Sequence, residues 1–374
     1  MESLDLKTLF GGIYKNKTVF LTGHTGFKGS WLAEWLRLLG ANVVGYSLKP
    51  DTEPAHFNLL KKGTSPYKPD DYTSIIADIN NVKALQKALK THNPDIVFHL
   101  AAQPLVRDSY KNPVLTYQTN VFGTLNLYEA IRSTPSVKAV ICVTTDKVYD
   151  NKEWERGYTE NDNLGGYDPY SASKACVEIL SDSYRKSFFQ DKILLATVRA
   201  GNVIGGGDWA NDRLLPDTVK AVVNNNPVFI RNPNAIRPWQ HVLEPLSAYL
   251  LLGQKLLTPS SNQSHYATAW NIAPDLADCQ PVKSVLEKVK KQWAKVDFQC
   301  ETDNENLHET HLLKLDTTKA KTELAWKPIW HLDKAIEKTI EWYKAFYDNN
   351  QVLTHSHIET YIKDAKQAHA VWTL

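Results

Sequence analysis

The chain has 374 residues, enough to bury one large core or two unequal ones, and its formal net charge is only +2. So small a charge gives no attraction to nucleic acid or to a membrane surface. The four cysteines show no paired spacing, the N-terminus lacks a signal-peptide pattern, and no apolar run approaches the roughly 18 residues of a membrane span. We therefore expect a cytoplasmic protein with reduced thiols.

A glycine motif follows the first predicted strand, which covers residues 17–22. The motif is Thr22-Gly-His-Thr-Gly-Phe-Lys-Gly29, and helical periodicity over 28–39 comes next. Glycine at 23, 26 and 29 removes side chains where the backbone turns, approaches a pyrophosphate and packs a helix against a strand. A tight turn without a ligand is the alternative, but the order strand, glycines, helix favours a dinucleotide site. The predicted cofactor contacts are Gly23, Thr25, Gly26, Phe27, Lys28 and Gly29.

Strands and helices alternate over the first two hundred residues. Further strands are predicted at 42–48, 73–77, 95–100, 137–144 and 193–200, and further helices at 80–91, 114–132 and 170–189. This alternation predicts an α/β fold with a doubly wound parallel sheet of the Rossmann type, covered by helices on both faces.

The pattern changes after residue 202. A loop over 205–212 and turns at 224–227 and 232–234 precede helices at 242–257, 281–294 and 333–347. The last segment, 351–374, is polar and weakly helical. We predict a Rossmann domain over 1–200, to which 236–273 returns. A smaller mixed α/β substrate lobe with C-terminal helices would comprise 201–235 and 274–374 and close over the carboxyl edge of the sheet.

Tyr170 and Lys174 form a Y-x-x-x-K pair at the start of the predicted helix 170–189. Positions i and i+4 share one face of a helix, so the phenol and the ammonium would lie together. A nearby cation lowers the pKa of a phenol, which allows it to act as a base near neutral pH. Taken alone the pair is common on solvated helix faces, but after the glycine motif it indicates catalysis.

With these two features, the chain resembles the extended short-chain dehydrogenase/reductase superfamily over roughly residues 15–330. Other segments carry the resemblance too: His99-Leu-Ala-Ala-Gln103, Val143-Thr-Thr-Asp-Lys-Val-Tyr149, the run from Arg199 to Trp209, and Arg237-Pro-Trp-Gln-His-Val242. Within the superfamily, Thr145-Asp146-Lys147 is similar to the catalytic triplet of sugar-nucleotide 4,6-dehydratases. The relatives that act on dTDP-glucose usually carry Glu where this chain has Lys147. A polar turn after a strand is the alternative interpretation of the triplet.

The resemblance also implies ligand contacts. Asp78 and Ile79 would contact the adenine, although Asp78 could instead cap a helix or a turn, and Ala101 and Gln103 would lie along the cofactor. The strand 42–48 ends on Ser47, without the acidic residue common in NAD enzymes, so NADP stays open while tightly bound, recycled NAD is favoured. The resemblance places Asn202, Arg237 and Asn271 on the nucleotide diphosphate, and the loop arginines Arg213 and Arg231 are further substrate candidates.

The activity that the resemblance implies is dehydration of a nucleotide hexose to its 4-keto-6-deoxy derivative. CDP-D-glucose is the favoured substrate, and the product would feed deoxysugar synthesis for a surface polysaccharide such as lipopolysaccharide O-antigen. Tyr170 would be the base at carbon 4, assisted by Thr145 and Lys174. Asp146 would be the acid at carbon 6, and Lys147 either the base at carbon 5 or a fixed charge. A homodimer or homotetramer is expected.

Three alternatives remain from the sequence. One is a dehydratase for a dTDP- or GDP-hexose, because no single residue specifies the nucleobase. A second is a 4-epimerase for a nucleotide sugar, which Asp146 and Lys147 disfavour because epimerisation at carbon 4 needs no acid at carbon 6. The third is a non-catalytic dinucleotide sensor, which has no need of Thr145, Tyr170 and Lys174 together.

No metal site is predicted. His308-Glu-Thr-His311 is one residue short of the H-E-x-x-H zinc pattern, and His355 and His357 are expected in a solvated tail.

Overall fold

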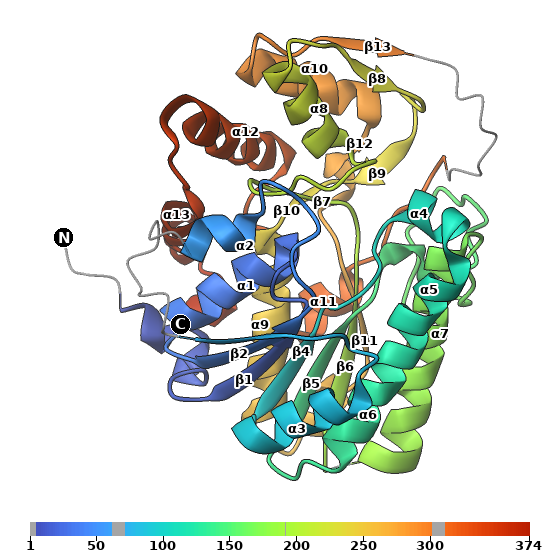
Figure 1. Ribbon diagram of the computed structural model, residues 1–374, viewed down its shortest axis with the longest axis vertical. Helices are drawn as coiled ribbons and strands as arrows, with labels where there is room; N and C mark the ends of the chain where they lie inside the picture. The colour runs from blue at the N-terminus through green and yellow to red at the C-terminus, as the bar shows by residue number, and fades with distance from the viewer. Residues whose placement is uncertain (1–4, 62–71, 191, 301–310) are drawn as a thin grey trace.

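The computed structural model describes residues 5–61, 72–190, 192–300 and 311–374. Within these residues, seven parallel strands form one sheet in the order β11-β6-β5-β4-β1-β2-β3 (Figure 1). They are β1 (Thr18–Thr22), β2 (Asn42–Ser47), β3 (Thr73–Ile76), β4 (Ile96–His99), β5 (Ala139–Val143), β6 (Leu194–Ala200) and β11 (Ala269–Ile272). The predicted Rossmann-type fold is confirmed, and β1 to β6 lie where strands were predicted.

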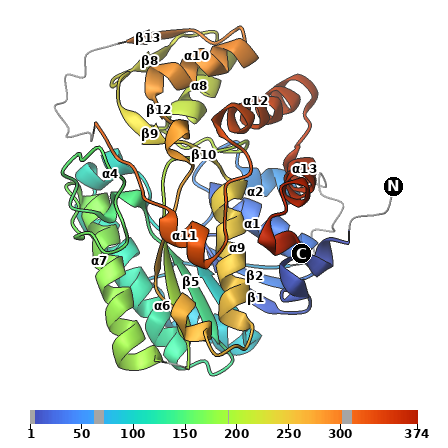
Figure 2. The same cartoon turned by 180° about the vertical axis from the view of Figure 1, so that it is seen from behind.

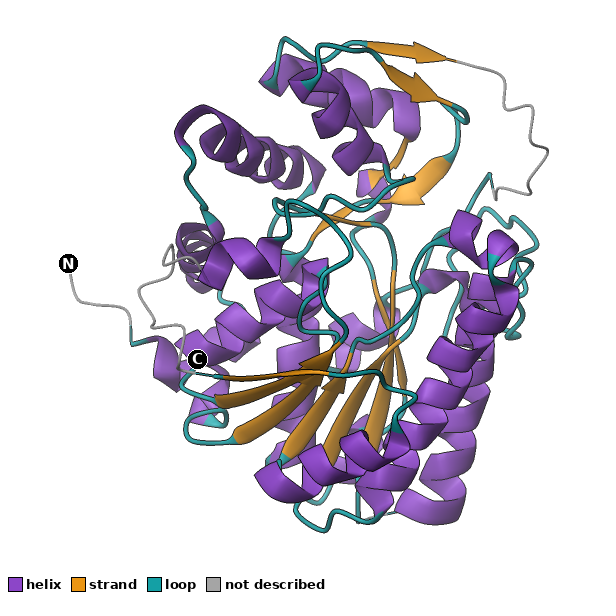
Figure 3. Ribbon diagram, viewed as in Figure 1, coloured by secondary structure: helices purple, strands orange, loops and turns teal. Residues whose placement is uncertain are grey.

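Helices cover both faces of the sheet (Figure 3). One face carries α1 (Phe27–Leu38) and α9 (Leu243–Leu257), and the other carries α3 (Val82–His92), α6 (Gly123–Arg132) and α7 (Pro169–Tyr184). The strands contribute side chains to the cores on both faces of the sheet, because successive side chains along a strand point to opposite faces. In β1, Val19 and Leu21 join the core under α1 and α9, whereas Phe20 joins the core under α3, α6 and α7.

A smaller group of helices and strands lies beyond the carboxyl edge of the sheet (Figure 1). It contains α8 (Leu214–Val223), β8 (Val228–Ile230), β9 (Ile236–Pro238), β12 (Cys279–Pro281), α10 (Val282–Gln292) and β13 (Phe298–Cys300). β9 pairs with β12 in antiparallel fashion and β8 pairs with β13 in parallel. A further pair, β7 (Val203–Ile204) with β10 (Gln240–His241), connects this group to the sheet. The sequence did not predict α8 or these short strands.

The remaining elements are short connections and the C-terminal helices. They are η1 (Leu6–Gly12), α2 (His56–Leu59), α4 (Val106–Lys111), α5 (Pro113–Tyr117), η4 (Gln118–Phe122), η5 (Asp146–Val148), η6 (Arg185–Phe189), η7 (Gln263–Tyr266), η8 (Leu276–Asp278), α11 (Thr318–Glu323), α12 (Leu332–Asn349), α13 (Thr354–Gln367) and η9 (Val371–Thr373). The predicted helix 114–132 is the continuous run from α5 through η4 to α6. The division of the chain into two domains stays a prediction.

The C-terminal segment is not the solvated tail that the sequence suggested. Helix α13 packs beside α1, as the reverse view in Figure 2 shows, and Ile358, Tyr361 and Ile362 are fully buried there. His357 is only 2% exposed, so its expected solvation is wrong. The helix was hard to recognise because polar residues separate the members of its apolar stripe.

None of the helices in the described part of the chain is long and apolar enough to cross a lipid bilayer. Likewise, the described residues hold no cluster of three or more histidine, cysteine or carboxylate side chains that could bind a metal ion. His308, from the near-miss zinc pattern, lies outside the described residues.

Candidate active site

The glycine motif forms the turn between β1 and α1. Gly23 has a φ of +76°, and a Cβ atom there would lie 2.8 Å from the backbone nitrogen of Ala101. A Cβ atom on Gly29 would lie 2.1 Å from the carbonyl oxygen of Gly23, so the helix can pack on the strand only without a side chain. Gly26 is different, because its Cβ position meets only one atom, at an ordinary 3.4 Å. It is also the N-cap of α1 and no side chain caps the helix, which leaves the amides of the first turn available to an anion.

Other predicted cofactor residues lie along the same edge of the sheet, in contact with protein atoms. The Thr25 hydroxyl donates to the carbonyl of Leu48 at 2.9 Å and shares a hydrogen bond with the Ser47 hydroxyl. The exposed Asp78 accepts the backbone N–H of Asn80 at 2.8 Å, which is the turn role considered as its alternative.

Two more of these residues pack within the protein itself. Ile79 packs against Gly123. Gln103 uses its side-chain amide inside its own loop, donating to Leu105 and Thr116. The cofactor roles of Asp78, Ile79, Ala101 and Gln103 stay predictions.

A cavity of about 350 Å³ lies where the carboxyl edge of the sheet faces the smaller group of elements. It brings together ten residues that the sequence singled out, from segments far apart in the chain. They are Phe27, Lys28, Thr145, Asp146, Lys147, Tyr170, Asn202, Arg213, Arg231 and Arg237. A pocket lined by a phenol, a carboxyl group and several cations can bind an anionic substrate and transfer protons within it.

Tyr170 stands in the first turn of α7. Asp168 caps this helix by accepting the backbone N–H of Ser171 at 2.9 Å. Burial raises the pKa of Tyr170 to about 12, and a hydrogen bond with Thr145 and the charge of Arg213 oppose that rise.

Lys174 has another partner than the predicted one. Its Nζ donates to the carbonyl of Val143 at 3.0 Å, and its charge is not among the main influences on the pKa of Tyr170. The expectation that Lys174 lowers the phenol pKa stays a prediction. Burial lowers the pKa of Lys174 itself.

Asp146 is 2% exposed and opens the short helix η5, for which Thr145 is the N-cap. The Thr145 hydroxyl donates to Asp146 Oδ1 at 2.9 Å, while Oδ2 has no hydrogen-bond partner among the described residues. Burial raises the pKa of Asp146, against the opposing charges of Lys147, Arg237 and Lys28. The carboxyl group thus has one oxygen without a bond and a tendency to hold its proton.

The cations around the cavity differ in how they are held. Arg213 donates to Asp208 at 2.9 Å, and Arg237, which is 8% exposed, donates to the carbonyl of Ile236 at 3.0 Å. Arg231 lies at the looser distance of 3.5 Å from Asp212.

Lys28 faces several charged neighbours. Burial and the nearby charges of Arg213 and Lys174 lower the pKa of Lys28 to about 8. Its ammonium therefore adds to the positive charge of the cavity at neutral pH while holding its proton less firmly than an exposed lysine.

Asn271 does not belong to the cavity. It is fully buried, and its side-chain amide donates to the carbonyls of Tyr158 and Asp316 while its oxygen accepts the Tyr149 hydroxyl. The structure therefore does not support its predicted contact with the diphosphate.

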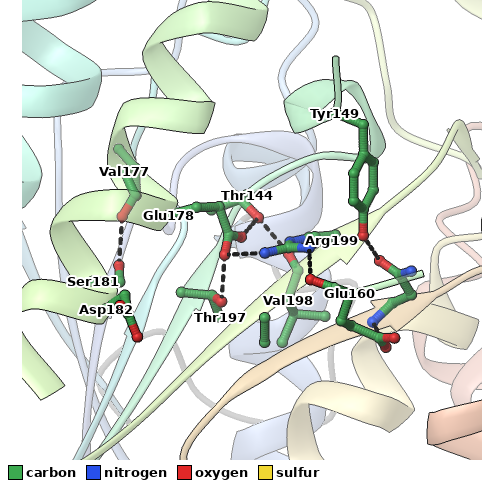
Figure 4. A network of polar contacts seen from close by, with 12 residues as sticks. Thr144, Tyr149, Glu160, Val177, Glu178, Ser181, Asp182, Thr197, Val198 and Arg199 are labelled. Atoms are coloured by element: carbon green, nitrogen blue, oxygen red, sulfur yellow. Dashed lines mark hydrogen bonds and ion pairs between the residues drawn. The ribbon is translucent and has the colours of Figure 1, made fainter. Parts of the chain in front are cut away.

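Through Tyr149, Asn271 instead joins a buried polar network that was not predicted from the sequence. Figure 4 shows the centre of this network. The network is centred on Glu178 and Arg199, which form an ion pair at 2.9 Å. Two signals were present in the sequence. Glu178 follows Lys174 by four residues, and Arg199 is a charged residue inside a mostly apolar strand.

Comparison with known proteins shows which proteins the chain is similar to. The sequence profile described as GDP-mannose 4,6 dehydratase matches residues 20–339. The chain is 46% identical to a CDP-glucose 4,6-dehydratase of Salmonella typhimurium over 347 residues, covering 91% of this chain and 94% of that protein. A dTDP-glucose 4,6-dehydratase of Xanthomonas campestris is 25% identical, with 87% and 93% covered.

Solved structures show the same fold. A dTDP-glucose 4,6-dehydratase of Bacillus anthracis, solved in complex with NAD, matches with a TM-score of 0.73 at 21% identity. The match covers 90% of this chain and 98% of that one.

Proposed function

The chain belongs to the GDP-mannose 4,6-dehydratase family, and we propose that within it this protein converts CDP-D-glucose to CDP-4-keto-6-deoxy-D-glucose with loss of water. The identity of 46% to a CDP-glucose 4,6-dehydratase supports this choice of substrate. The observation that carries the proposal is Asp146, a buried carboxyl group with a raised pKa and an unpartnered oxygen, in the same cavity as Tyr170. A dehydratase needs such an acid as well as a base, and a simple 4-epimerase does not.

NAD is the proposed cofactor, and the glycine turn fits it. Gly26 leaves the backbone open to close approach, and the uncapped N-terminus of α1 offers amides for a pyrophosphate. When bound, NAD supplies a hydride acceptor for carbon 4 of the sugar and later a hydride donor for carbon 6. Because Ser47 at the end of β2 provides no carboxylate for a ribose hydroxyl, NADP stays open as the less favoured alternative.

The residues of the cavity divide the proton transfers between them. Tyr170 removes the proton of the carbon-4 hydroxyl, and the Thr145 hydroxyl, which donates to Asp146 in this structure, would turn its proton to the phenolate to stabilise it. Lys174 contributes its positive charge from the same helix. Asp146, held by Thr145, gives its proton to the carbon-6 hydroxyl, which leaves as water.

Two further tasks fall to lysine and arginine. Once carbon 4 is a ketone, the carbon-5 proton becomes acidic, and Lys147, which lines the cavity next to Asp146, would remove it. Arg213, Arg231 and Arg237, together with Asn202, line the remainder of the cavity and would bind the substrate diphosphate.

Purified protein incubated separately with CDP-, dTDP-, UDP- and GDP-glucose tests the proposal. We expect the 4-keto-6-deoxy product from CDP-glucose at a kcat/KM at least about 10-fold above the others, since nucleobase discrimination of that size needs only one or two good hydrogen bonds. Preferred conversion of dTDP- or GDP-glucose would show that the nucleobase is wrong. Formation of a 4-epimer without dehydration would show that the reaction is wrong.

We further infer that the protein is a cytoplasmic homodimer that supplies a deoxysugar for a surface polysaccharide. The free cysteines among the described residues suit a reducing compartment. Exposed apolar side chains gather on the adjacent helices α5, η4 and α7, including Leu115, Phe122 and Ile179. A second copy of this chain is the proposed occupant of that surface, and a homotetramer would require a second interface.

A further inference from the structure

The buried ion pair between Glu178 and Arg199 lies directly beneath the proposed catalytic residues. Both side chains are almost fully buried, at 2% and 4% exposure. Glu178 also accepts the hydroxyl of Thr197 at 2.8 Å and the hydroxyl of Thr144. The partners keep the pKa of Glu178 below its usual value in spite of burial, so the carboxylate stays ionised. A buried pair whose carboxylate oxygens are both bonded can fix the relative positions of the elements that supply it, although the Nε atom of Arg199 has no hydrogen-bond partner among the described residues.

The network forms hydrogen bonds at both ends of the catalytic turn. The turn consists of Thr145 and the helix η5, and it is flanked by Thr144 on one side and Tyr149 on the other. Thr144 donates to Glu178, whereas the Tyr149 hydroxyl accepts from Arg199 at 2.8 Å (Figure 4). The two halves of one ion pair therefore hold the two ends of the turn that carries Asp146 and Lys147.

The same carboxylate belongs to the catalytic helix. Glu178 follows Tyr170 by eight residues and Lys174 by four on α7, so the three share one face. Arg199 comes from β6, next to the strand that leads into the catalytic turn. The ion pair thus connects three elements: the helix with Tyr170 and Lys174, the turn with Asp146, and the neighbouring strand.

Glu178 also affects the pKa of Lys174. Four titratable groups face Lys174: Lys28 from α1, His99 from β4, Cys142 from β5 and Glu178 from α7 itself. Burial lowers the pKa of His99 to about 3 and raises that of Cys142 to about 11, so both are neutral near pH 7. Cys142 and then Glu178 raise the pKa of Lys174 against the effect of burial, and with Cys142 in its neutral form Glu178 is the anion of this set.

We propose that Glu178 and Arg199 are a positioning pair for the dehydration. The pair fixes the catalytic turn against the catalytic helix, and the Glu178 carboxylate keeps Lys174 protonated. This inference rests on the proposed function for its kinetic consequences, whereas its electrostatic consequence is independent of the substrate.

The first experiment uses two variants of residue 178, one that removes the charge and one that shortens the side chain. Glu178→Gln should lower kcat for CDP-glucose by about 10-fold or more, with KM changed less than about 3-fold, because displacement of catalytic groups by an ångström costs up to about 100-fold in rate. The alkaline limb of its kcat profile should move to lower pH. Glu178→Asp keeps the charge but not the reach, so it should restore the position of the limb while kcat stays low.

Glu34→Gln is the matched control, because Glu34 forms a buried ion pair with Arg37 inside α1, at 3.1 Å. It should lower the melting temperature but leave kcat and the pH profile of the folded enzyme unchanged. An equal loss of kcat in both variants would assign Glu178 a merely structural role and overturn the proposal. So would a folded Glu178→Gln enzyme with wild-type kcat and alkaline limb.

A second variant covers the case in which Glu178→Gln does not fold. Tyr149→Phe removes only the hydroxyl that joins the turn to Arg199 and keeps the ring stacked on Tyr158. A fall in kcat of about 3-fold or more at constant KM supports the proposal, and an unchanged kcat contradicts it.

A readout without substrate separates this proposal from the proposed function. In protein labelled with ¹³C-lysine, NMR titration gives the pKa of Lys174, assigned with Lys174→Arg. Replacement of Glu178 by Gln should lower that pKa, because it removes the negative charge beside Lys174. An unchanged pKa would overturn the proposal even if the wild-type enzyme is fully active. Inactivity of the wild type towards every nucleotide hexose would instead refute the proposed function alone.

Discussion

Tyr170 is a neutral phenol at neutral pH in this structure, since burial raises its pKa to about 12. A base with so high a pKa depends on its surroundings, and Thr145 and Arg213 are the groups that act in the right direction here. Tyr170→Phe should lower turnover by about 10²–10⁴-fold, the usual contribution of a general base, with nearly unchanged nucleotide binding. Steady-state kinetics beside a CDP-glucose binding titration would check this. A variant that keeps more than about a tenth of its activity would remove Tyr170 from the base role.

Asp146 combines a raised pKa with an unpartnered oxygen, which suits a proton donor. Asp146→Asn keeps the shape of the side chain and removes the acid. The cycle should then stop after oxidation of carbon 4, and the absorbance of the reduced cofactor should accumulate after rapid mixing with substrate. Elimination at the wild-type rate would assign Asp146 a structural role, through its bond to Thr145.

Lys147 occupies the position where dTDP-glucose relatives usually carry Glu, and we predict that it removes the carbon-5 proton. Lys147→Met should then abolish deuterium incorporation at carbon 5 from heavy water while some oxidation at carbon 4 persists. Lys147→Arg separates the base from a fixed charge, because arginine keeps its proton in proteins. An active Arg variant with normal deuterium uptake would contradict the prediction and favour a water molecule or Tyr170 as the proton carrier.

At the scale of elements, two glycines in the turn from β1 to α1 have different predicted roles: Gly29 in the packing of the fold and Gly26 in the binding of NAD. Gly29→Ala places a Cβ atom 2.1 Å from the carbonyl oxygen of Gly23. We expect it to destabilise the fold by about 1–3 kcal/mol, as overpacking does, and to weaken NAD binding as well. Gly26→Ala meets no such obstacle, so it should weaken NAD binding at an unchanged melting temperature. Thermal unfolding and a cofactor titration on both variants are the measurements, and unaltered NAD affinity in Gly26→Ala would refute the predicted pyrophosphate contact.

The elements that could be predicted are those whose signal is local. β1, β4, β5 and β6 are largely apolar runs, as expected of parallel strands buried on both faces, and the helices between the strands have regular apolar periodicity. β11 was missed because it has only four residues and contains the polar Asn271. α8 was missed because Pro216 stands in its first turn and a polar loop precedes it.

The site residues that could be predicted are likewise those with a local signal in the sequence. The glycines, Tyr170 with Lys174, and the triplet at 145–147 are contiguous or periodic in sequence, and the cavity collects Tyr170 and the triplet. The predicted diphosphate contact of Asn271 is not supported, because its burial depends on distant partners, such as Tyr149 and Asp316, that no local pattern reveals. Glu178 and Arg199 were overlooked for the same reason, because their pairing joins a helix to a strand and leaves no local pattern in the sequence.

At the scale of the whole molecule, the exposed apolar surface on η4 and α7 predicts self-association. Ile179 is 60% exposed, and Ile179→Asp should weaken the dimer by placing a charge in the proposed interface. Leu276→Asp is the control, because Leu276 is similarly exposed, at 64%, on a different element. Sedimentation velocity on the three proteins would decide. A monomeric wild type, or equal dissociation in both variants, would contradict the predicted interface.

The position of β11 affects the order in which the sheet can be completed during synthesis. β6 is an inner strand of the finished sheet, but its outer neighbour β11 comes about seventy residues later in the chain. Ribosomes add about 5–20 residues per second, so the outer side of β6 stays unpaired for roughly 4–14 seconds. An open apolar edge of this kind is a template for aggregation unless polar side chains interrupt it. Thr197 and Arg199 interrupt β6, so the strand that contributes to the buried ion pair also carries its own protection while the nascent chain is incomplete.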